Sequence, residues 1–97
     1  MIVTGLNKIR LFIEIYPEAK APLTHWLKTI ESNNFEHFIA LKQSFNSVDF
    51  DKKTKETIFD LGGNKFRLIC TVIYTYYTVR IMEILTHEMY DKKNKRR

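Results

Sequence analysis

One turn signal constrains the fold of this chain more than any other feature. The stretch Gly62-Gly63-Asn64 stands between two segments in which apolar residues recur at every second position. A period of two residues is typical of a half-buried strand, and such a Gly-rich stretch is typical of the tight turn in a β-hairpin. The sequence therefore predicts an antiparallel hairpin around residues 62–64.

The strands on either side divide their side chains between two faces of the predicted sheet. Before the turn, Thr57, Phe59 and Leu61 alternate with Ile58 and Asp60. After it, one face carries Phe66, Leu68, Cys70, Val72 and Tyr74, and the other carries Lys65, Arg67, Ile69, Thr71 and Ile73. A last extended segment, after a connection near residues 75–77, places Val79, Ile81 and Leu85 on one face and Arg80, Met82 and Ile84 on the other. The C-terminal half thus predicts an antiparallel meander.

The N-terminal half begins with the period of a helix instead. After a short opening strand at Ile2 and Val3, Thr4 is the expected N-cap of a first helix, which Pro17 ends. The apolar face of this helix carries Leu6, Ile9, Phe12, Ile13 and Tyr16. The residues Ile9, Leu11, Ile13 and Ile15 also alternate as in a strand. We favour the helix.

Two further helices are predicted before the strands. The second has Pro22 in its first turn and buries Leu23, Trp26, Leu27 and Ile30. The third is capped by Asn34, carries Phe35, Phe38, Ile39, Leu41 and Phe45, and is followed by a polar loop over residues 46–54. Helices first and strands afterwards predict an α+β fold, with N-terminal helices packed on one face of a small, mainly antiparallel sheet.

The positive charge is concentrated at one end of the chain. The net charge is +5, and this whole excess comes from Lys92, Lys93, Lys95, Arg96 and Arg97. The other eleven basic residues balance the eleven acidic ones. We expect a single domain over residues 1–91 and a basic C-terminal tail over residues 92–97. The tail is either a solvated end or an arm for nucleic acid or the ribosome.

Features that the sequence lacks indicate a location. Cys70 is the only cysteine, so neither an intrachain disulfide nor a multi-cysteine metal site can form, as is typical of a reducing cytoplasm. No apolar run approaches the roughly 18–20 residues of a membrane span, and the N-terminus does not resemble a signal peptide. We expect a cytoplasmic protein with no membrane partner.

Cationic and polar side chains gather on one face of the predicted sheet. Lys65 and Arg67 are two residues apart and share that face, and Arg80 lies on the neighbouring strand. His87 and Tyr90 become neighbours if the segment after that strand is helical. Such a cluster suits a phosphodiester, because cations hold phosphate and His or Lys can move protons. The alternative is a set of ordinary solvent-facing residues. No nucleotide-binding, zinc-protease or clustered metal-ligand motif is present, so we expect no cofactor and no metal.

Two longer motifs resemble a known family. Residues 58–69, Ile-Phe-Asp-Leu-Gly-Gly-Asn-Lys-Phe-Arg-Leu-Ile, resemble the F-N-I-G-G-N-K-Y-R-L-I strand pair of the HigB-type toxins. Residues 85–92 resemble the closing T-H-x-x-Y-D-K of that family. Upstream, residues 16–26 are similar to its H-P-x-A-x-x-P-L-x-x-W helix entry, and residues 45–49 to its F-P-S-A-D loop. The similarity covers nearly the whole chain in one register.

The resemblance implies a RelE-like fold and the toxin half of a type II toxin–antitoxin module. It implies a metal-independent endoribonuclease, an mRNA interferase that cleaves mRNA on the ribosome and inhibits translation. It also implies a HigA-like helix-turn-helix antitoxin as the partner. In the implied reaction the ribose 2′-hydroxyl attacks the adjacent phosphate and leaves a 2′,3′-cyclic phosphate and a 5′-hydroxyl.

The resemblance also gives the candidate residues their roles. Lys65 and Arg67 would bind the scissile phosphate. His87 would transfer a proton, with Lys65 as the alternative base, and Tyr90 would stack on a base or hydrogen-bond the phosphate. The other residues expected to contact RNA are Asn64, Arg80, Asp91, Lys92 and Lys93.

One position departs from the family pattern. The family usually has an arginine five residues before the histidine of T-H-x-x-Y, where this chain has Met82. Arg80, two residues earlier, is the candidate to replace that cation. An alternative function is a catalytically inactive RelE-like partner that binds its antitoxin and contributes to operon autoregulation. On charge alone, a small RNA- or ribosome-binding protein that uses the basic tail is a third.

Overall fold

The predicted hairpin forms the middle of a five-stranded sheet. The structure, a computed structural model, describes residues 1–95. Strands β3 (Glu56–Leu61) and β4 (Phe66–Ile73) pair antiparallel, with Leu61 opposite Phe66 across the turn. The strand order in the sheet is β1-β5-β4-β3-β2.

The turn depends on consecutive residues with positive φ. Gly62, Gly63 and Asn64 have φ values of 64°, 62° and 76°. Glycine adopts this left-handed backbone without a steric penalty, and asparagine adopts it more readily than most other residues. These conformations explain why the stretch fixes both the hairpin and its register, so this prediction is confirmed.

The remaining strands extend the sheet on both sides of the hairpin. β5 (Thr78–Thr86) returns antiparallel to β4 after the 3₁₀ turn η2 (Tyr74–Tyr76). β1 (Ile2–Thr4) pairs parallel with β5, and β2 (Asp49–Asp51) pairs antiparallel with β3. The sheet is therefore mainly antiparallel, as predicted. The prediction of a polar loop over residues 46–54 was wrong in part, because this segment contains the short edge strand β2.

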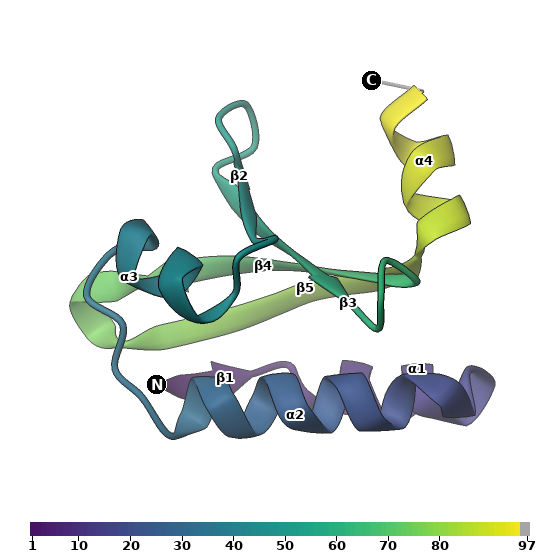
Figure 1. The fold of residues 1–97 in the computed structure, drawn as a ribbon, viewed down its shortest axis with the longest axis horizontal. Helices are drawn as coiled ribbons and strands as arrows, with labels where there is room; N and C mark the ends of the chain where they lie inside the picture. Colours follow the sequence, from purple (N-terminus) through teal and green to yellow (C-terminus); the bar gives the residue numbers. More distant parts are fainter. Residues whose placement is uncertain (96–97) are drawn as a thin grey trace.

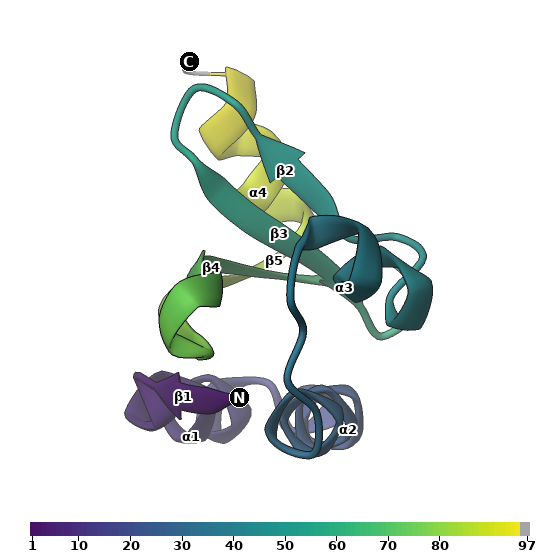
Figure 2. The same cartoon turned by 90° about the vertical axis from the view of Figure 1, so that its left-hand side faces the viewer.

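Two helices cover one face of the sheet. α1 (Leu6–Ile15) and α2 (Lys20–Glu31) are joined by the 3₁₀ turn η1 (Pro17–Ala19) and lie side by side below β4 and β5 (Figure 1, Figure 2). The α2 side chains that face the sheet are fully buried: Leu23, Trp26 and Ile30. The centroids of the Trp26 and Phe59 rings are 5.4 Å apart. The predicted α+β arrangement is confirmed.

The start of α1 differs from the prediction. Thr4 belongs to β1, and the N-cap of α1 is Gly5, with a φ of 85°. A Cβ at this position would lie 2.9 Å from the carbonyl oxygen of Ile81. The close approach of the β1–α1 connection to β5 therefore requires glycine, and the prediction of Thr4 as the cap was wrong.

Helix α3 (Phe38–Ser44) also starts later than predicted. His37 caps it, because its Nδ1 accepts a hydrogen bond from the backbone N–H of Ala40 at 3.1 Å. The predicted cap Asn34 and the predicted helical residue Phe35 lie in the connection before α3. Phe35 is nevertheless buried in the main core. Phe35 is therefore apolar because it packs in the core, although it does not belong to a helix.

A register shift divides β5 into two parts. Cys70 on β4 pairs with Ile81, whereas the preceding Ile69 pairs with Glu83. Met82 is therefore an extra residue in β5, which is the pattern of a β-bulge. Because one residue is skipped, the alternation of side chains between the two faces reverses after Met82.

The bulge corrects two predicted orientations. Ile84 packs in the main core beneath the sheet, and Leu85 packs on the opposite face with Ile58 and Ile69. The predicted faces of Ile84 and Leu85 were wrong because the alternation was continued through the bulge. The reversal sets Leu85 opposite Arg67. The chain that leaves β5 thus emerges beside the candidate site.

The segment after β5 forms a longer helix than the predicted short turn. α4 (His87–Lys95) stands on the face opposite α1 and α2 (Figure 1). Thr86 caps it, since its Oγ1 accepts from the backbone N–H of Met89 at 3.2 Å. The helix crosses residue 91, so residues 92–95 of the predicted tail are helical, while residues 96 and 97 lie outside the described residues. Over residues 1–95, none of the helices combines the length and apolar character needed to span a bilayer.

Candidate functional site

Arg67 lies at the centre of a hydrogen-bonded cluster on the sheet face where α4 stands. Its side chain is only 11% exposed, and Nη1 donates to Oδ1 of Asp60, directly opposite on β3, at 2.9 Å. Nη2 donates to Oδ1 of Asn64, in the turn, at 2.7 Å. A buried charge is tolerated only when it is paired and hydrogen-bonded. Asp60 and Asn64 therefore make a cation possible at this position.

His87 connects this cluster to α4. Its Nδ1 lies 3.0 Å from Nη2 of Arg67, and its Nε2 lies 3.1 Å from Oδ2 of Asp91. Its backbone N–H donates to the carbonyl oxygen of Lys65 at 2.8 Å, which ties the start of α4 to the hairpin. The side chains of His87 and Asp91 are 46% and 51% exposed. They form the part of the cluster that a ligand can reach.

Tyr90 covers the cluster from the next turn of α4. Cζ of Arg67 lies 5.5 Å from the centroid of the Tyr90 ring, within the range of a cation–π contact. The same ring packs against the small apolar cluster of Ile58, Ile69 and Leu85. The helical neighbourhood predicted for His87 and Tyr90 is confirmed, and both side chains contact Arg67.

An open hollow of about 400 Å³ lies beside the cluster. It is lined by Tyr16 and Glu18 from the end of α1 and η1, by residues 64–66 of the hairpin, and by residues 86–88. A hollow of this volume can hold a nucleotide-sized group. Lys65 is exposed there, and its side chain has no hydrogen bond or ion pair within residues 1–95. Its charge is therefore available to a ligand.

The sequence interpretation missed three residues of this region. Asp60 could have been found, because a four-residue connection after Leu61 puts it opposite Arg67 in the hairpin register. Tyr16 and Glu18 reach the hollow from a distant part of the chain. No spacing in the sequence links that part to the hairpin, so only the tertiary fold brings them together.

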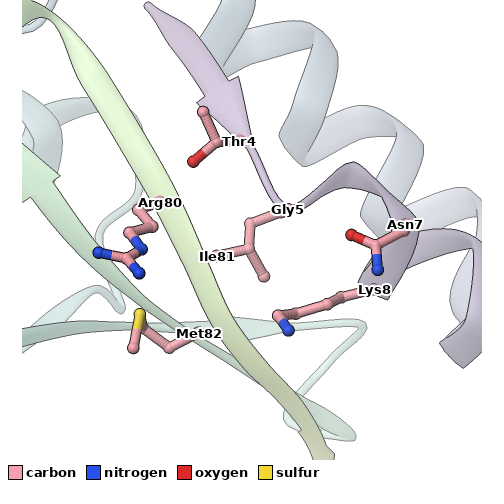
Figure 3. A pocket seen from close by; sticks show the side chains of 7 residues that line it. All are labelled: Thr4, Gly5, Asn7, Lys8, Arg80, Ile81 and Met82. Atoms are coloured by element: carbon pink, nitrogen blue, oxygen red, sulfur yellow. The ribbon is translucent and has the colours of Figure 1, made fainter.

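Arg80 lies apart from the cluster. It pairs with Thr71, four positions along β4 from Arg67, which is a separation of roughly 13 Å at the rise of a strand. It lines a second hollow of about 260 Å³, together with Thr4, Asn7, Lys8 and Met82 (Figure 3). Arg80 and Met82 extend to the same side of β5, as expected, and Ile81 extends to the other side (Figure 3). The structure nevertheless does not bring Arg80 to Lys65, Arg67 and His87.

The two α4 lysines expected to contact RNA differ in their surroundings. Lys92 is exposed. Nζ of Lys93 lies 2.6 Å from Oε2 of Glu83 on β5, and this ion pair ties α4 to the sheet. The charge of Lys93 is thus partly neutralised within the protein, whereas that of Lys92 faces solvent.

Within residues 1–95, the site includes neither a reactive cysteine nor a metal-binding cluster. Burial raises the pKa of the Cys70 thiol, so this side chain stays protonated and inert, as predicted for a structural cysteine. Within residues 1–95, no three His, Cys, Asp or Glu side chains are arranged to hold a metal ion. The functional groups of the site are cations, carboxylates, an imidazole and a phenol.

Comparisons with known proteins match this chain to one family. A family model described as HigB_toxin, the RelE-like toxic component of a toxin–antitoxin system, matches residues 19–93. The mRNA interferase toxin HigB of Escherichia coli is 34% identical over 79 residues, which are 80% of this chain and 76% of that protein. The mRNA interferase HigB of Shigella flexneri matches with the same identity and coverage. The chain therefore belongs to the HigB family of RelE-like toxins, the toxic components of toxin–antitoxin systems.

Proposed function

We propose that this chain is an endoribonuclease, an mRNA interferase that cleaves mRNA without a metal and thereby inhibits translation. The observation that carries this proposal is the convergence of Lys65, Arg67, His87 and Tyr90 beside one open hollow. The names of the relatives, which are called mRNA interferases, support the same reaction. As a toxin of a toxin–antitoxin family, the chain has an antitoxin partner.

The proposed reaction is an internal displacement at phosphorus. The ribose 2′-oxygen forms a bond to the adjacent phosphorus and loses its proton, while the bond from phosphorus to the 5′-oxygen breaks and that oxygen gains a proton. The products are a 2′,3′-cyclic phosphate and a 5′-hydroxyl. Negative charge grows on the phosphate oxygens in the transition state, and fixed cations stabilise such charge. Lys65 supplies a charge that can touch the phosphate, and the buried Arg67 adds a positive field from below.

The remaining polar residues are proposed to contact the RNA around the cleaved bond. Asn64 and Asp91 lie next to Arg67 and His87, and Tyr90 can stack on a base or donate to the phosphate. Lys92 and Lys93 extend this surface along α4. Arg80 lies roughly 13 Å along the sheet, so it would contact RNA away from the cleaved bond.

We further propose that cleavage takes place on the ribosome, in the cytoplasm, and that the partner is a HigA-like helix-turn-helix antitoxin. Outside the last six residues the basic and acidic residues balance, so few phosphate contacts are available to bind free RNA tightly. A ribosome that already holds the message supplies position and orientation, which a weakly binding nuclease lacks.

Expression of the chain without an antitoxin tests this function. We expect growth arrest and discrete 5′ ends inside translated frames, mapped by sequencing of the message ends. A matched control is Lys65→Ala, which removes an exposed side chain that has no hydrogen bond or ion pair within residues 1–95. We expect it to keep the fold and to lose toxicity. Unchanged growth and intact messages, at high levels of folded protein, would contradict the proposal. That result would favour the inactive antitoxin partner, which the methionine at position 82 already makes the second candidate.

A further inference from the structure

The terminal N–H groups of Arg67 are fully used within the protein. Nη1 donates to Oδ1 of Asp60 and lies 3.3 Å from each of the carbonyl oxygens of Asn64 and Phe66. Nη2 faces Oδ1 of Asn64 and Nδ1 of His87. The four hydrogens on these two nitrogens thus all have acceptors. In this arrangement Arg67 has no pair of terminal N–H groups left for a phosphate.

This arrangement fixes the tautomer of His87. Arginine only donates hydrogen bonds, so the ring nitrogen that faces Arg67 must accept. A neutral imidazole carries one proton, which then sits on Nε2 and is donated to Asp91 at 3.1 Å. His87 therefore presents an N–H group, and not a free lone pair, on its exposed side.

Asp60 is the carboxylate partner of the guanidinium and makes the shortest hydrogen bond to Nη1, at 2.9 Å. Its side chain is 25% exposed and lies opposite Arg67 in the hairpin register. By holding Nη1, it leaves Nη2 aimed at His87. No other carboxylate within residues 1–95 contacts Arg67. Without Asp60, the guanidinium loses its charged partner, and Nη1 keeps only the two carbonyl oxygens at 3.3 Å.

We propose that Asp60 is a positioning residue that acts through Arg67 to hold His87 as the Nε2–H tautomer. His87 then serves the reaction as a hydrogen-bond donor to the scissile phosphate, and not as the group that accepts the 2′-hydroxyl proton. A phosphate oxygen takes the place of the Asp91 carboxylate at Nε2. The 2′-hydroxyl proton passes to solvent water in the open hollow, because the charged ammonium group of Lys65 has no lone pair to accept it. The role of Asp60 stands on geometry alone, whereas the role of His87 rests on the proposed function.

The tautomer can be measured without any enzymatic assay. The chain has three histidines, so a nitrogen–proton correlation spectrum of protein with isotope-labelled histidine resolves them, and His87→Asn identifies the His87 signals. At a mildly alkaline pH, where ordinary imidazoles are neutral, we expect His87 to show a pure Nε2–H pattern. The exposed His25 should show the average of two exchanging tautomers. The terminal protons of Arg67 should appear as separate, slowly exchanging signals.

Variants of Asp60 test whether it holds this state. In Asp60→Ala we expect the His87 signals to move to the averaged position and the separate Arg67 signals to disappear. Asp60→Asn keeps an acceptor oxygen and should retain both. Asp49→Ala, which removes an exposed carboxylate on β2, is the control. A wild-type His87 protonated on Nδ1 would overturn the inference, as would a folded Asp60→Ala with wild-type signals. If Asp60→Ala does not fold, the test uses the wild type and Asp60→Asn. An Nε2–H pattern for His87 in both proteins would support the inference, and its absence from either would overturn it.

Cleavage assays test the role of His87. Asparagine supplies an N–H donor but cannot take up a proton, so His87→Asn should keep at least about a tenth of the wild-type rate. His87→Ala should lose on the order of 10²–10³-fold, as when one donor to a transition-state oxyanion is removed. Equal losses in both variants would overturn the donor role. Absence of cleavage by the wild type would contradict the proposed function, and the spectra would still decide the role of Asp60.

Discussion

Arg67 combines two tasks at the scale of a single residue. Its guanidinium is buried, yet it lies one hydrogen bond from the exposed His87. Removing it takes the donor from His87 and the counter-charge from Asp60 at the same time. Lys65, two residues earlier, has the same charge but no partner within residues 1–95. The two cations therefore separate structural from chemical effects.

We expect Arg67→Ala to lower the free energy of unfolding by about 1–3 kcal/mol, because it leaves the partly buried carboxylate of Asp60 without its cationic donor. Lys65→Ala should change it by less than about 0.5 kcal/mol, as exposed substitutions generally do. Both variants should lose toxicity. Urea unfolding of the purified variants measures the difference, and equal stabilities would show that the buried network contributes nothing to the fold.

Cys70 gives a prediction about pH. Burial raises the pKa of the folded thiol above its ordinary value of 9.0. The unfolded chain therefore releases this proton at a lower pH than the folded chain, and the stability linked to the neutral thiol is present below pH 9.0 and declines above it. The loss of stability in Cys70→Ala should accordingly be largest below that pH and shrink at higher pH. Unfolding curves of both proteins over an alkaline series check this, and parallel curves would refute it.

At the scale of an element, α4 depends on its first turn. Oγ1 of Thr86 accepts from the backbone N–H of Met89, and the next residue is His87. We expect Thr86→Ala to cost about 0.5–2 kcal/mol of stability, as the loss of an N-cap does, and to lower activity because His87 loses its fixed position. Thr86→Ser, which keeps the hydroxyl, should restore both. Thermal unfolding and cleavage rates measure the pair, and a Thr86→Ser variant as impaired as Thr86→Ala would contradict the capping role.

The elements also show where a sequence determines structure locally. The hairpin was predictable because Gly62, Gly63 and Asn64 are residue types that adopt the positive φ of this turn more readily than most others. The bulge at Met82 was not, because neither glycine nor proline marks it and the register of β4 against β5 decides it. The late start of α3 has the same kind of cause, since the cap is the imidazole of His37 and not the expected Asn34.

The candidate site was predictable to a similar extent. Alternation placed Lys65 and Arg67 on one face, and helical spacing placed His87 beside Tyr90. The burial of Arg67 and its bond to Asp60 depend on how the hairpin and α4 close over each other, which spacing does not encode. The position of Arg80 was misjudged because adjacency between strands does not give the distance along them.

At the scale of the whole molecule, one face of the sheet is used for packing and the other carries the candidate site. One face and its helices form the main core, and the other carries Arg67 and the α4 residues around it. In the sequence, residues 92–97 carry five of the sixteen basic side chains. We expect removal of residues 94–97 to leave the cleavage chemistry intact.

The same truncation should weaken binding to ribosomes and make it less dependent on salt. Each lost contact to single-stranded RNA should reduce the slope of log affinity against log salt by about 0.7. Cosedimentation with ribosomes over a series of salt concentrations measures this slope. An unchanged slope would reduce these residues to a solvated end.

The parallel pairing of β1 with β5 also governs when this protein can become harmful during its own synthesis. β1 leaves the ribosome first, but its neighbour in the sheet is the last strand to be made. Domains generally fold as units, so the sheet cannot close while β5 is still inside the ribosome. His87 and Tyr90 follow β5 in the chain and are made later still. A nascent copy therefore lacks a complete candidate site for almost the whole of its translation, and the order of its strands delays the proposed activity until β5 and α4 have been made.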